Sequence, residues 1–210
     1  MIAKGSTEIS KVCLGSDELS KVCLGDDVIW TAEQGMRYVQ YIESTGTQYL
    51  ETGMTPTSTS EFIVDADFVK YANDDTFFSA STNWSFSQLT LFWSGQNWYF
   101  AVKNAPFKQN FDRYIYKVVG STIYVDDVQK VTNYWYNSYV NTTLKIFCHG
   151  SKSRNSGGKL YGSTFKDNGT LLQNLVPVAI GNVGYMLDTI SGNLFGDANG
   201  GYFTPGPDVV

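Results

Sequence analysis

The chain has 210 residues, of which 42% are hydrophobic, 15% aromatic and 17% charged. This length and apolar content suit one large β domain, or a domain with a small appendage, that buries a sizeable core. The formal net charge of −5 argues against a nucleic-acid partner, because such binding depends on lysine and arginine side chains that neutralise phosphates.

The sequence shows no membrane or targeting signal. No run approaches the roughly 18 apolar residues that a membrane span needs, and the first residues lack a basic start followed by an apolar stretch. We therefore expect a protein that is made and kept in soluble form, with no membrane partner. The three cysteines are an odd number without C-x-x-C spacing, which argues against a disulfide framework and a zinc site.

The first predicted element is a repeat. The hexapeptide SKVCLG occupies residues 10–15 and again 20–25, and DDVIW follows the second copy. Glycines in one phase of this repeat predict turns, and the segments between them predict a three-stranded β-meander over residues 1–32. Three short strands barely bury enough surface to be stable alone. We therefore expect residues 1–32 to be an anchoring and docking module.

One face of this leader is predicted to contact a partner. Side chains alternate along a strand, so the valine and leucine of each KVCL copy face one way and the cysteine faces the other. Cys13 and Cys23 would come close if the two copies paired as neighbouring strands, but the favoured interpretation is that they are two small apolar residues at equivalent repeat positions. The candidate docking residues are Val12, Leu14, Val22, Leu24, Ile29 and Trp30.

Residues 36–210 predict an all-β domain. The segment EFIVDADF places Phe62, Val64, Ala66 and Phe68 on one face and acidic residues with Ile63 on the other, a period of two that a helix would not give. Further short β-rich runs follow, separated by Gly, Asn, Asp or Ser at intervals typical of a β-sandwich. The pair at 126–127 interrupts two apolar runs and predicts a tight hairpin, because Asp tolerates the turn conformation.

Two sequence blocks carry a resemblance to a known family. The domain opens with YIESTGTQYLETG at residues 41–53. Its C-terminal part predicts a strand, a DNG turn at 167–169 and a second strand that ends in NLVPV, with matching segments at 166–169, 174–178, 184–192 and 203–209. Together these blocks resemble the concanavalin A-like, laminin-G-type jelly-roll virion proteins of gut-bacterial phages (Bacteroides-type, crAss-like). The SKVCLG doublet is similar to the K-V-Y-L-G repeat leader of such proteins, with Cys in place of Tyr in both copies.

The resemblance implies a fold, a function and a location. It implies a concanavalin A-like jelly-roll β-sandwich over residues 36–210, preceded by the small repeat module. It implies a bacteriophage virion structural protein, such as a head fibre, a capsid decoration or a tail-associated protein, made in the bacterial host cytoplasm and carried in the virion. Its partners would be other capsid or tail proteins. A homo-oligomer such as a trimer would suit the polar surface and the short leader.

The C-terminal tail is predicted to close the domain. Tyr202 and Phe203 are expected to hold the tail against the sandwich before two prolines stiffen its exit. The loop DANGG at residues 197–201 resembles a calcium loop, but it supplies one carboxylate and one amide, whereas calcium usually takes six or more oxygens. The sequence thus implies no metal site and no cofactor, with calcium kept as the alternative.

The sequence argues against an enzyme. Glycoside hydrolases need two carboxylates across a bound sugar, and Asp65 and Asp67 share a strand face about 7 Å apart. The compact E-x-D-x-x-E strand of such hydrolases is absent, however, and acidic residues on a solvated face are ordinary. His149 is the one histidine and follows Cys148 directly, so the two side chains would point in opposite directions along a strand.

Glycan binding is the alternative function. Aromatic faces can stack against the apolar faces of sugars, and the segment TNYWYNSY is the best candidate patch for a host-surface carbohydrate or a subunit contact. Its candidate residues are Tyr134, Trp135, Tyr136 and Tyr139. Trp93 and Trp98 flank a predicted hairpin, where we expect them to pair across the strands and stabilise the turn.

Overall fold

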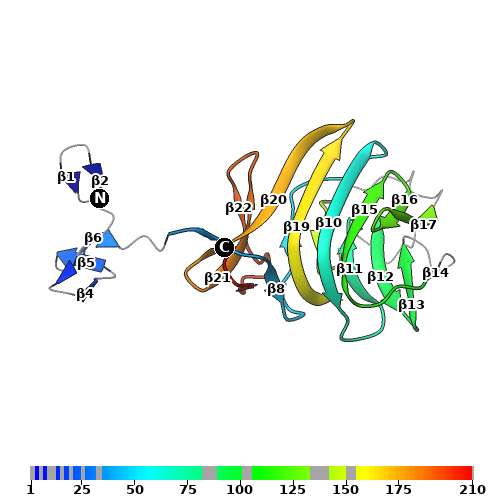
Figure 1. The fold of residues 1–210 in the computed structure, drawn as a ribbon, viewed down its shortest axis with the longest axis horizontal. Helices are drawn as coiled ribbons and strands as arrows, with labels where there is room; N and C mark the ends of the chain where they lie inside the picture. The colour runs from blue at the N-terminus through cyan, green and yellow to red at the C-terminus, as the bar shows by residue number, and fades with distance from the viewer. Residues whose placement is uncertain are drawn as a thin grey trace. The chain divides into compact units, whose positions relative to one another are not determined.

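The computed structural model describes residues 35–81, 89–100, 106–132, 142–149 and 155–209, together with six short strand segments between residues 3 and 31. In this part of the chain there are β-strands and turns but no helix, so the predicted all-β fold is confirmed. It follows that none of the described residues belongs to a helix that could cross a membrane. The chain forms two compact units, Met1–Met36 and Arg37–Val210 (Figure 1).

The described segments of the first unit form three two-stranded antiparallel hairpins. They are formed by β1 (Ala3–Lys4) with β2 (Thr7–Glu8), β3 (Cys13–Leu14) with β4 (Asp17–Glu18), and β5 (Lys21–Leu24) with β6 (Asp27–Thr31). Lys4 lies opposite Thr7, Leu14 opposite Asp17, and Leu24 opposite Asp27. The ten-residue sequence repeat is therefore also a repeat of hairpin register.

This pairing differs from the three-stranded meander expected from the sequence. Each repeat carries Gly-Ser or Gly-Asp between its two strands, and a glycine at the first of two loop residues favours a tight hairpin. A hairpin therefore closes inside each repeat instead of across consecutive repeats. The strand that holds Cys13 pairs with β4 and the strand that holds Cys23 pairs with β6, so the described pairing does not place the two cysteines on neighbouring strands.

The second unit is built around a large antiparallel sheet. Its path runs β17-β16-β15-β10-β19-β20-β21-β22, and β8 pairs with β19 and β23 while β7 pairs with β20. Within the described residues its strands are β7 (Arg37–Tyr38), β8 (Ile42–Ser44), β10 (Ser60–Val69), β15 (Arg113–Val119), β16 (Thr122–Val125), β17 (Val128–Thr132), β19 (Gly157–Asp167), β20 (Thr170–Ile180), β21 (Val183–Asp188), β22 (Leu194–Phe195) and β23 (Thr204–Pro205). Figure 1 shows the long strands β20, β19 and β10 side by side.

A smaller antiparallel sheet covers one face of the large sheet. Its order is β14-β13-β12-β11-β18-β9. The described strands are β9 (Leu50–Glu51), β11 (Asp75–Ser79), β12 (Thr90–Ser94), β13 (Asn97–Phe100), β14 (Pro106–Phe107) and β18 (Lys145–Ile146). Side chains from both sheets form one hydrophobic core, so the unit is a two-layer sandwich.

The strand β10 shows how the sequence pattern makes this core. Phe62, Val64, Ala66 and Phe68 are at most 1% exposed, as the alternation of EFIVDADF predicts. The ring of Phe62 meets that of Phe78 edge-on with centroids 5.3 Å apart, and Phe68 lies 4.9 Å from Phe77, so these contacts join the two sheets. The other face of β10 points away from the smaller sheet.

Tight hairpins connect neighbouring strands where the sequence predicts turns. Asp126 and Asp127 have φ angles of 48° and 61°, and they form the two-residue loop between β16 and β17. Asn168 and Gly169, with φ angles of 49° and 77°, form the loop between β19 and β20. Positive φ at both loop residues is the type I′ geometry, whose twist matches paired strands. The predicted turns at both positions are confirmed.

The C-terminal tail pairs with the beginning of the same unit. β23 pairs with β8, Val39 bridges Asp208, and Arg37 forms an ion pair with Asp208. Phe203 is 1% exposed and belongs to the core, so its predicted role in holding the tail is confirmed. Tyr202 is 69% exposed, so its predicted part in that contact is wrong: on adjacent residues of an extended chain only one side chain can enter the core.

Candidate functional site

The residues predicted as contact sites lie mostly where side chains are not described. Val12, Tyr134, Trp135, Tyr136 and Tyr139 lie outside the described residues. The other predicted docking residues lie on strands of the first unit: Leu14 on β3, Val22 and Leu24 on β5, and Ile29 and Trp30 on β6. Within this hairpin Val22 lies opposite Trp30. These positions remain predictions as contact sites.

Trp93 and Trp98 have a structural role. They lie directly opposite each other across the β12–β13 hairpin, which confirms the predicted cross-strand pair. Trp98 is 1% exposed, and its indole Nε1 donates to the carbonyl oxygen of Gln109 over 2.7 Å. The ammonium of Lys70 lies 3.3 Å from the ring centre of Trp93. Both tryptophans therefore belong to the framework of the smaller sheet.

A polar surface lies on the large sheet, on the side away from the smaller sheet. We call it the outward face and define it by Tyr41, Glu43, Asp65, Asp67, Arg113, Lys159 and Tyr161. It brings together strands from distant parts of the chain, because β10 pairs with β15 on one side and with β19 on the other, and β19 pairs with β8.

A β-bulge sets the position of Tyr161 on this face. Leu160 lies opposite Ala66 and Gly162 opposite Asp65, so Tyr161 is an extra residue in β19. Bulges re-aim side chains and are frequent near functional sites. Here the bulge lets Leu160 enter the core while Tyr161 meets Arg113, whose guanidinium carbon is 3.7 Å from the centre of the tyrosine ring.

Arg113 joins Asp65 to Tyr161. Its Nε and one terminal nitrogen donate to the two carboxylate oxygens of Asp65, each over 2.8 Å. Hydrogen bonding to Asp65 raises the pKa of Arg113 above its ordinary value. Both oxygens of Asp65 thus accept from one guanidinium, which is the strong bidentate form of an Arg–carboxylate pair.

Asp67, the second acidic residue of the same strand face, has a different environment. Burial raises the pKa of Asp67 above its ordinary value, and the charge of Asp112 raises it further, while Lys159 acts in the opposite direction. Lys159 lies opposite both Asp67 and Glu43 across the neighbouring strands. Asp67 therefore holds its proton to a higher pH than an ordinary aspartate, beside a carboxylate, Asp65, that is paired with Arg113.

Tyr41 completes the face. Its ring meets Tyr161 edge-on with centroids 5.4 Å apart, and the ammonium of Lys159 lies 4.7 Å from its centre. A Cβ on Gly206 would approach the Tyr41 ring to 3.0 Å, so the C-terminal tail packs directly on this ring. The pKa of Lys159 is raised above its ordinary value. The phenol oxygen of Tyr41 contributes most to this rise, and the carboxylate of Glu43 contributes next.

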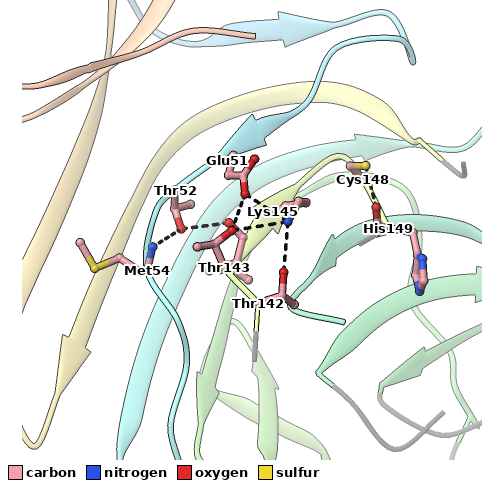
Figure 2. A network of polar contacts seen from close by, with 9 residues as sticks. Glu51, Thr52, Met54, Thr142, Thr143, Lys145, Cys148 and His149 are labelled. Atoms are coloured by element: carbon pink, nitrogen blue, oxygen red, sulfur yellow. Dashed lines mark hydrogen bonds and ion pairs between the residues drawn. The ribbon is translucent and has the colours of Figure 1, made fainter. Parts of the chain in front are cut away.

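A second polar network lies at the edge of the smaller sheet (Figure 2). Lys145 is 4% exposed and lies opposite Glu51 in the β9–β18 pair. Its ammonium is 3.3 Å from a carboxylate oxygen of Glu51 and 3.4 Å from the hydroxyls of Thr142 and Thr143. The Lys145 side chain is buried and that of Glu51 is partly exposed, so loss of Glu51 would leave a buried ammonium without its charged partner, and the network fixes the short strand β9 to β18.

Cys148 and His149 follow in the same segment. Both are at most 2% exposed, and the thiol of Cys148 donates to the backbone carbonyl oxygen of His149 over 2.8 Å. In Figure 2 the imidazole extends to the other side of the backbone from the thiol. This arrangement agrees with the expected opposite directions of the two side chains.

Two carboxylates fix the turns of the closing sequence block. Asp188 accepts hydrogen bonds from the Ser191 hydroxyl and from three backbone N–H groups, those of Asn174, Ile190 and Ser191. Asp197 accepts from the backbone N–H of Tyr49, Asn199 and Gly201. Oxygens that accept N–H bonds in this way shape a turn, and the described residues contain no cluster of three His, Cys, Asp or Glu side chains suited to a metal ion.

The sequence interpretation missed Tyr41, Arg113, Lys159 and Tyr161. One signal was available for Tyr161: the strand GGKLYGST carries glycines on both sides of the tyrosine, and glycine within a strand often marks a bulge. Comparisons of the chain with family models, with curated proteins and with solved structures found no match.

Proposed function

We propose that this chain is a structural protein of a bacteriophage virion, attached through the hairpin repeats of its first unit and projecting the β-sandwich of its second. The observation that carries the proposal is the division of the chain into two compact units. The segments that resemble the phage leader lie in one unit, and those that resemble the jelly-roll domain lie in the other.

The positions of the matched sandwich segments support this proposal. The opening block at 41–53 contributes β8, which pairs with β23 of the closing block. Asp188, in the matched segment 184–192, fixes the turn after β21 through its four hydrogen bonds. The shared residues therefore specify a frame, as expected for a structural family whose members differ in what they contact. The two antiparallel layers suit a concanavalin A-like jelly roll.

The hairpins of the first unit suit attachment. An isolated two-stranded hairpin is marginally stable at best, so each gains from contact with additional strands or with a partner. In the proposal the partner is a capsid or tail protein, and several copies of the chain, such as a trimer, stand on the particle.

The test uses phage particles assembled with a double variant of the full chain, Val12→Asp with Val22→Asp. A charge on the predicted contact face should keep the chain out of purified particles while the sandwich remains folded. Cys13→Ser with Cys23→Ser, on the opposite predicted face, is the matched control and should be incorporated normally. Normal incorporation of the aspartate variant would contradict attachment through this face.

A further inference from the structure

Tyr71 is a large side chain supported from one side. It follows β10 and is 59% exposed. A Cβ on Gly46 would come within 2.7 Å of the tyrosine ring, and a Cβ on Gly157 within 2.8 Å of the same ring atom. The ring therefore rests on two glycines, and a larger residue at either position would displace it.

The backbone around Tyr71 is also fixed. Asp75 is 4% exposed, and one of its carboxylate oxygens accepts the backbone N–H groups of both Tyr71 and Ala72. A side chain that is already held in place loses little conformational entropy when it binds a ligand. Tyr71 is thus prepared as a contact surface.

Tyr71 extends the outward face at one end. Alternate residues of a strand share a face, so Gly157 points to the same side as Lys159. Lys159 lies opposite Asp67 and Glu43, and Gly157 lies opposite Val69, the next outward position of β10. The ring that covers Gly157 therefore lies beside the charged residues of the outward face.

The three tyrosines here differ in what covers their rings. The guanidinium of Arg113 lies over Tyr161, while Lys159 and Gly206 approach Tyr41. Tyr71 has backbone beneath it and most of its surface in solvent. Among these three, Tyr71 is the ring that offers an aromatic surface to a ligand.

The surrounding groups indicate the ligand chemistry. Glu43 and Asp67 provide acceptors and Lys159 provides donors, which suit a ligand rich in hydroxyl groups. The outward face carries three carboxylates, on Glu43, Asp65 and Asp67, and two cations, on Lys159 and Arg113. The excess of one negative charge disfavours an acidic ligand.

We propose that the outward face at Tyr71 binds a neutral saccharide. The Tyr71 ring packs against the C–H face of a sugar, and Glu43, Asp67 and Lys159 bond to its hydroxyls. This activity goes beyond the role in the particle and does not depend on it. It places glycan binding on described residues, at a distance in sequence from the TNYWYNSY patch.

The test screens the full chain against an array of neutral oligosaccharides of glucose, galactose, mannose and N-acetylglucosamine, with uronic-acid and sialic-acid oligosaccharides beside them. The strongest neutral binder is then titrated by calorimetry. Tyr71→Ala should weaken binding by about tenfold or more, which corresponds to about 1.4 kcal/mol. Tyr71→Phe keeps the ring and should retain most of the affinity. Tyr202→Ala removes another exposed tyrosine, 69% exposed against 59% for Tyr71, and should leave the affinity unchanged.

A measurement on the unaltered protein guards against a folding defect in Tyr71→Ala. Tetranitromethane nitrates exposed tyrosines, and the bound saccharide should slow nitration of Tyr71 but not of Tyr202. Binding confined to acidic saccharides, no neutral saccharide bound, or equal nitration with and without saccharide would each overturn the proposal. Particle incorporation of Tyr71→Ala should be normal. Failure of the saccharide proposal is therefore distinguishable from failure of the proposed virion role.

Discussion

The turn after β21 and the outward face of β10 use their carboxylates differently. Asp188 is 2% exposed, and its oxygens accept four hydrogen bonds. Asp67 lies on the outward face, between strands that carry Lys159 and Arg113. The closing block therefore holds the frame, whereas the outward face keeps its polar groups turned toward solvent.

The pKa directions of these two residues reflect that difference. Burial alone would raise the pKa of Asp188, but the Ser191 hydroxyl and three backbone N–H groups lower it below its ordinary value. Burial raises the pKa of Asp67. A lowered pKa in the folded state means that Asp188 stabilises the protein above its unfolded pKa of about 3.9, and that this contribution is lost as the pH falls. The pKa of Asp67 is raised instead, so ionisation of Asp67 lowers the stability of the folded protein, and this cost disappears as the pH falls below its unfolded pKa.

The largest expected effect is that of Phe203→Ala. The ring is buried in the core, so its removal should lower the free energy of unfolding by about 3–5 kcal/mol. Urea denaturation measures the change, with Tyr202→Ala as the exposed neighbour that should cost less than about 0.5 kcal/mol. Equal effects of the two variants would show that the tail does not hold the frame.

The next effect is that of Asp188→Asn, which replaces a carboxylate that accepts four hydrogen bonds. We expect a loss of about 2–3 kcal/mol at pH 7. The loss should shrink as the pH falls through the lowered pKa of Asp188, because the native carboxyl is then protonated too. Asp127→Asn, which removes a surface ion pair with Lys117, should cost at most about 1 kcal/mol. A loss for Asp188→Asn that is independent of pH would contradict the role given to its charge.

A smaller effect is expected for Arg113→Met. The variant keeps an unbranched apolar stem but loses the ion pair to Asp65 and the cation over Tyr161, together worth about 1 kcal/mol at this partly exposed site. Thermal unfolding measures the stability. If Arg113 shields the Tyr161 ring, tetranitromethane should also nitrate Tyr161 faster in the variant; an unchanged nitration rate would contradict this.

The smallest effect, with the opposite sign, is that of Asp67→Asn. Because the pKa of Asp67 is raised, its ionised form is disfavoured in the folded state. The neutral amide should therefore stabilise the protein at pH 7, by less than about 0.5 kcal/mol at this half-buried position. The gain should disappear near pH 3, where both states are protonated. Denaturant titrations at the two pH values measure the free energy of unfolding. A lower stability of Asp67→Asn than of the unaltered protein at pH 7 would contradict the role given to burial of Asp67.

Local patterns predicted much of the fold, and the missing parts depend on distant contacts. The alternation of EFIVDADF and the turn residues at 126–127 and 168–169 each act within a few residues, so the core face of β10 and the hairpins were accessible from sequence. Tyr71 and its supports Gly46 and Gly157 belong to three separate segments, and only the folded register brings them together. The leader was predicted in part: its strands were expected from the sequence, but their pairing inside each repeat was not.

The abundance of this chain in purified phage particles tests the virion role most directly. Quantitative mass spectrometry of particles, washed at high salt and compared with the host lysate, measures it. We expect several copies of the full chain per particle, and loss of the chain from particles for Val12→Asp with Val22→Asp. A chain that is abundant in the lysate but absent from purified particles would contradict the virion role.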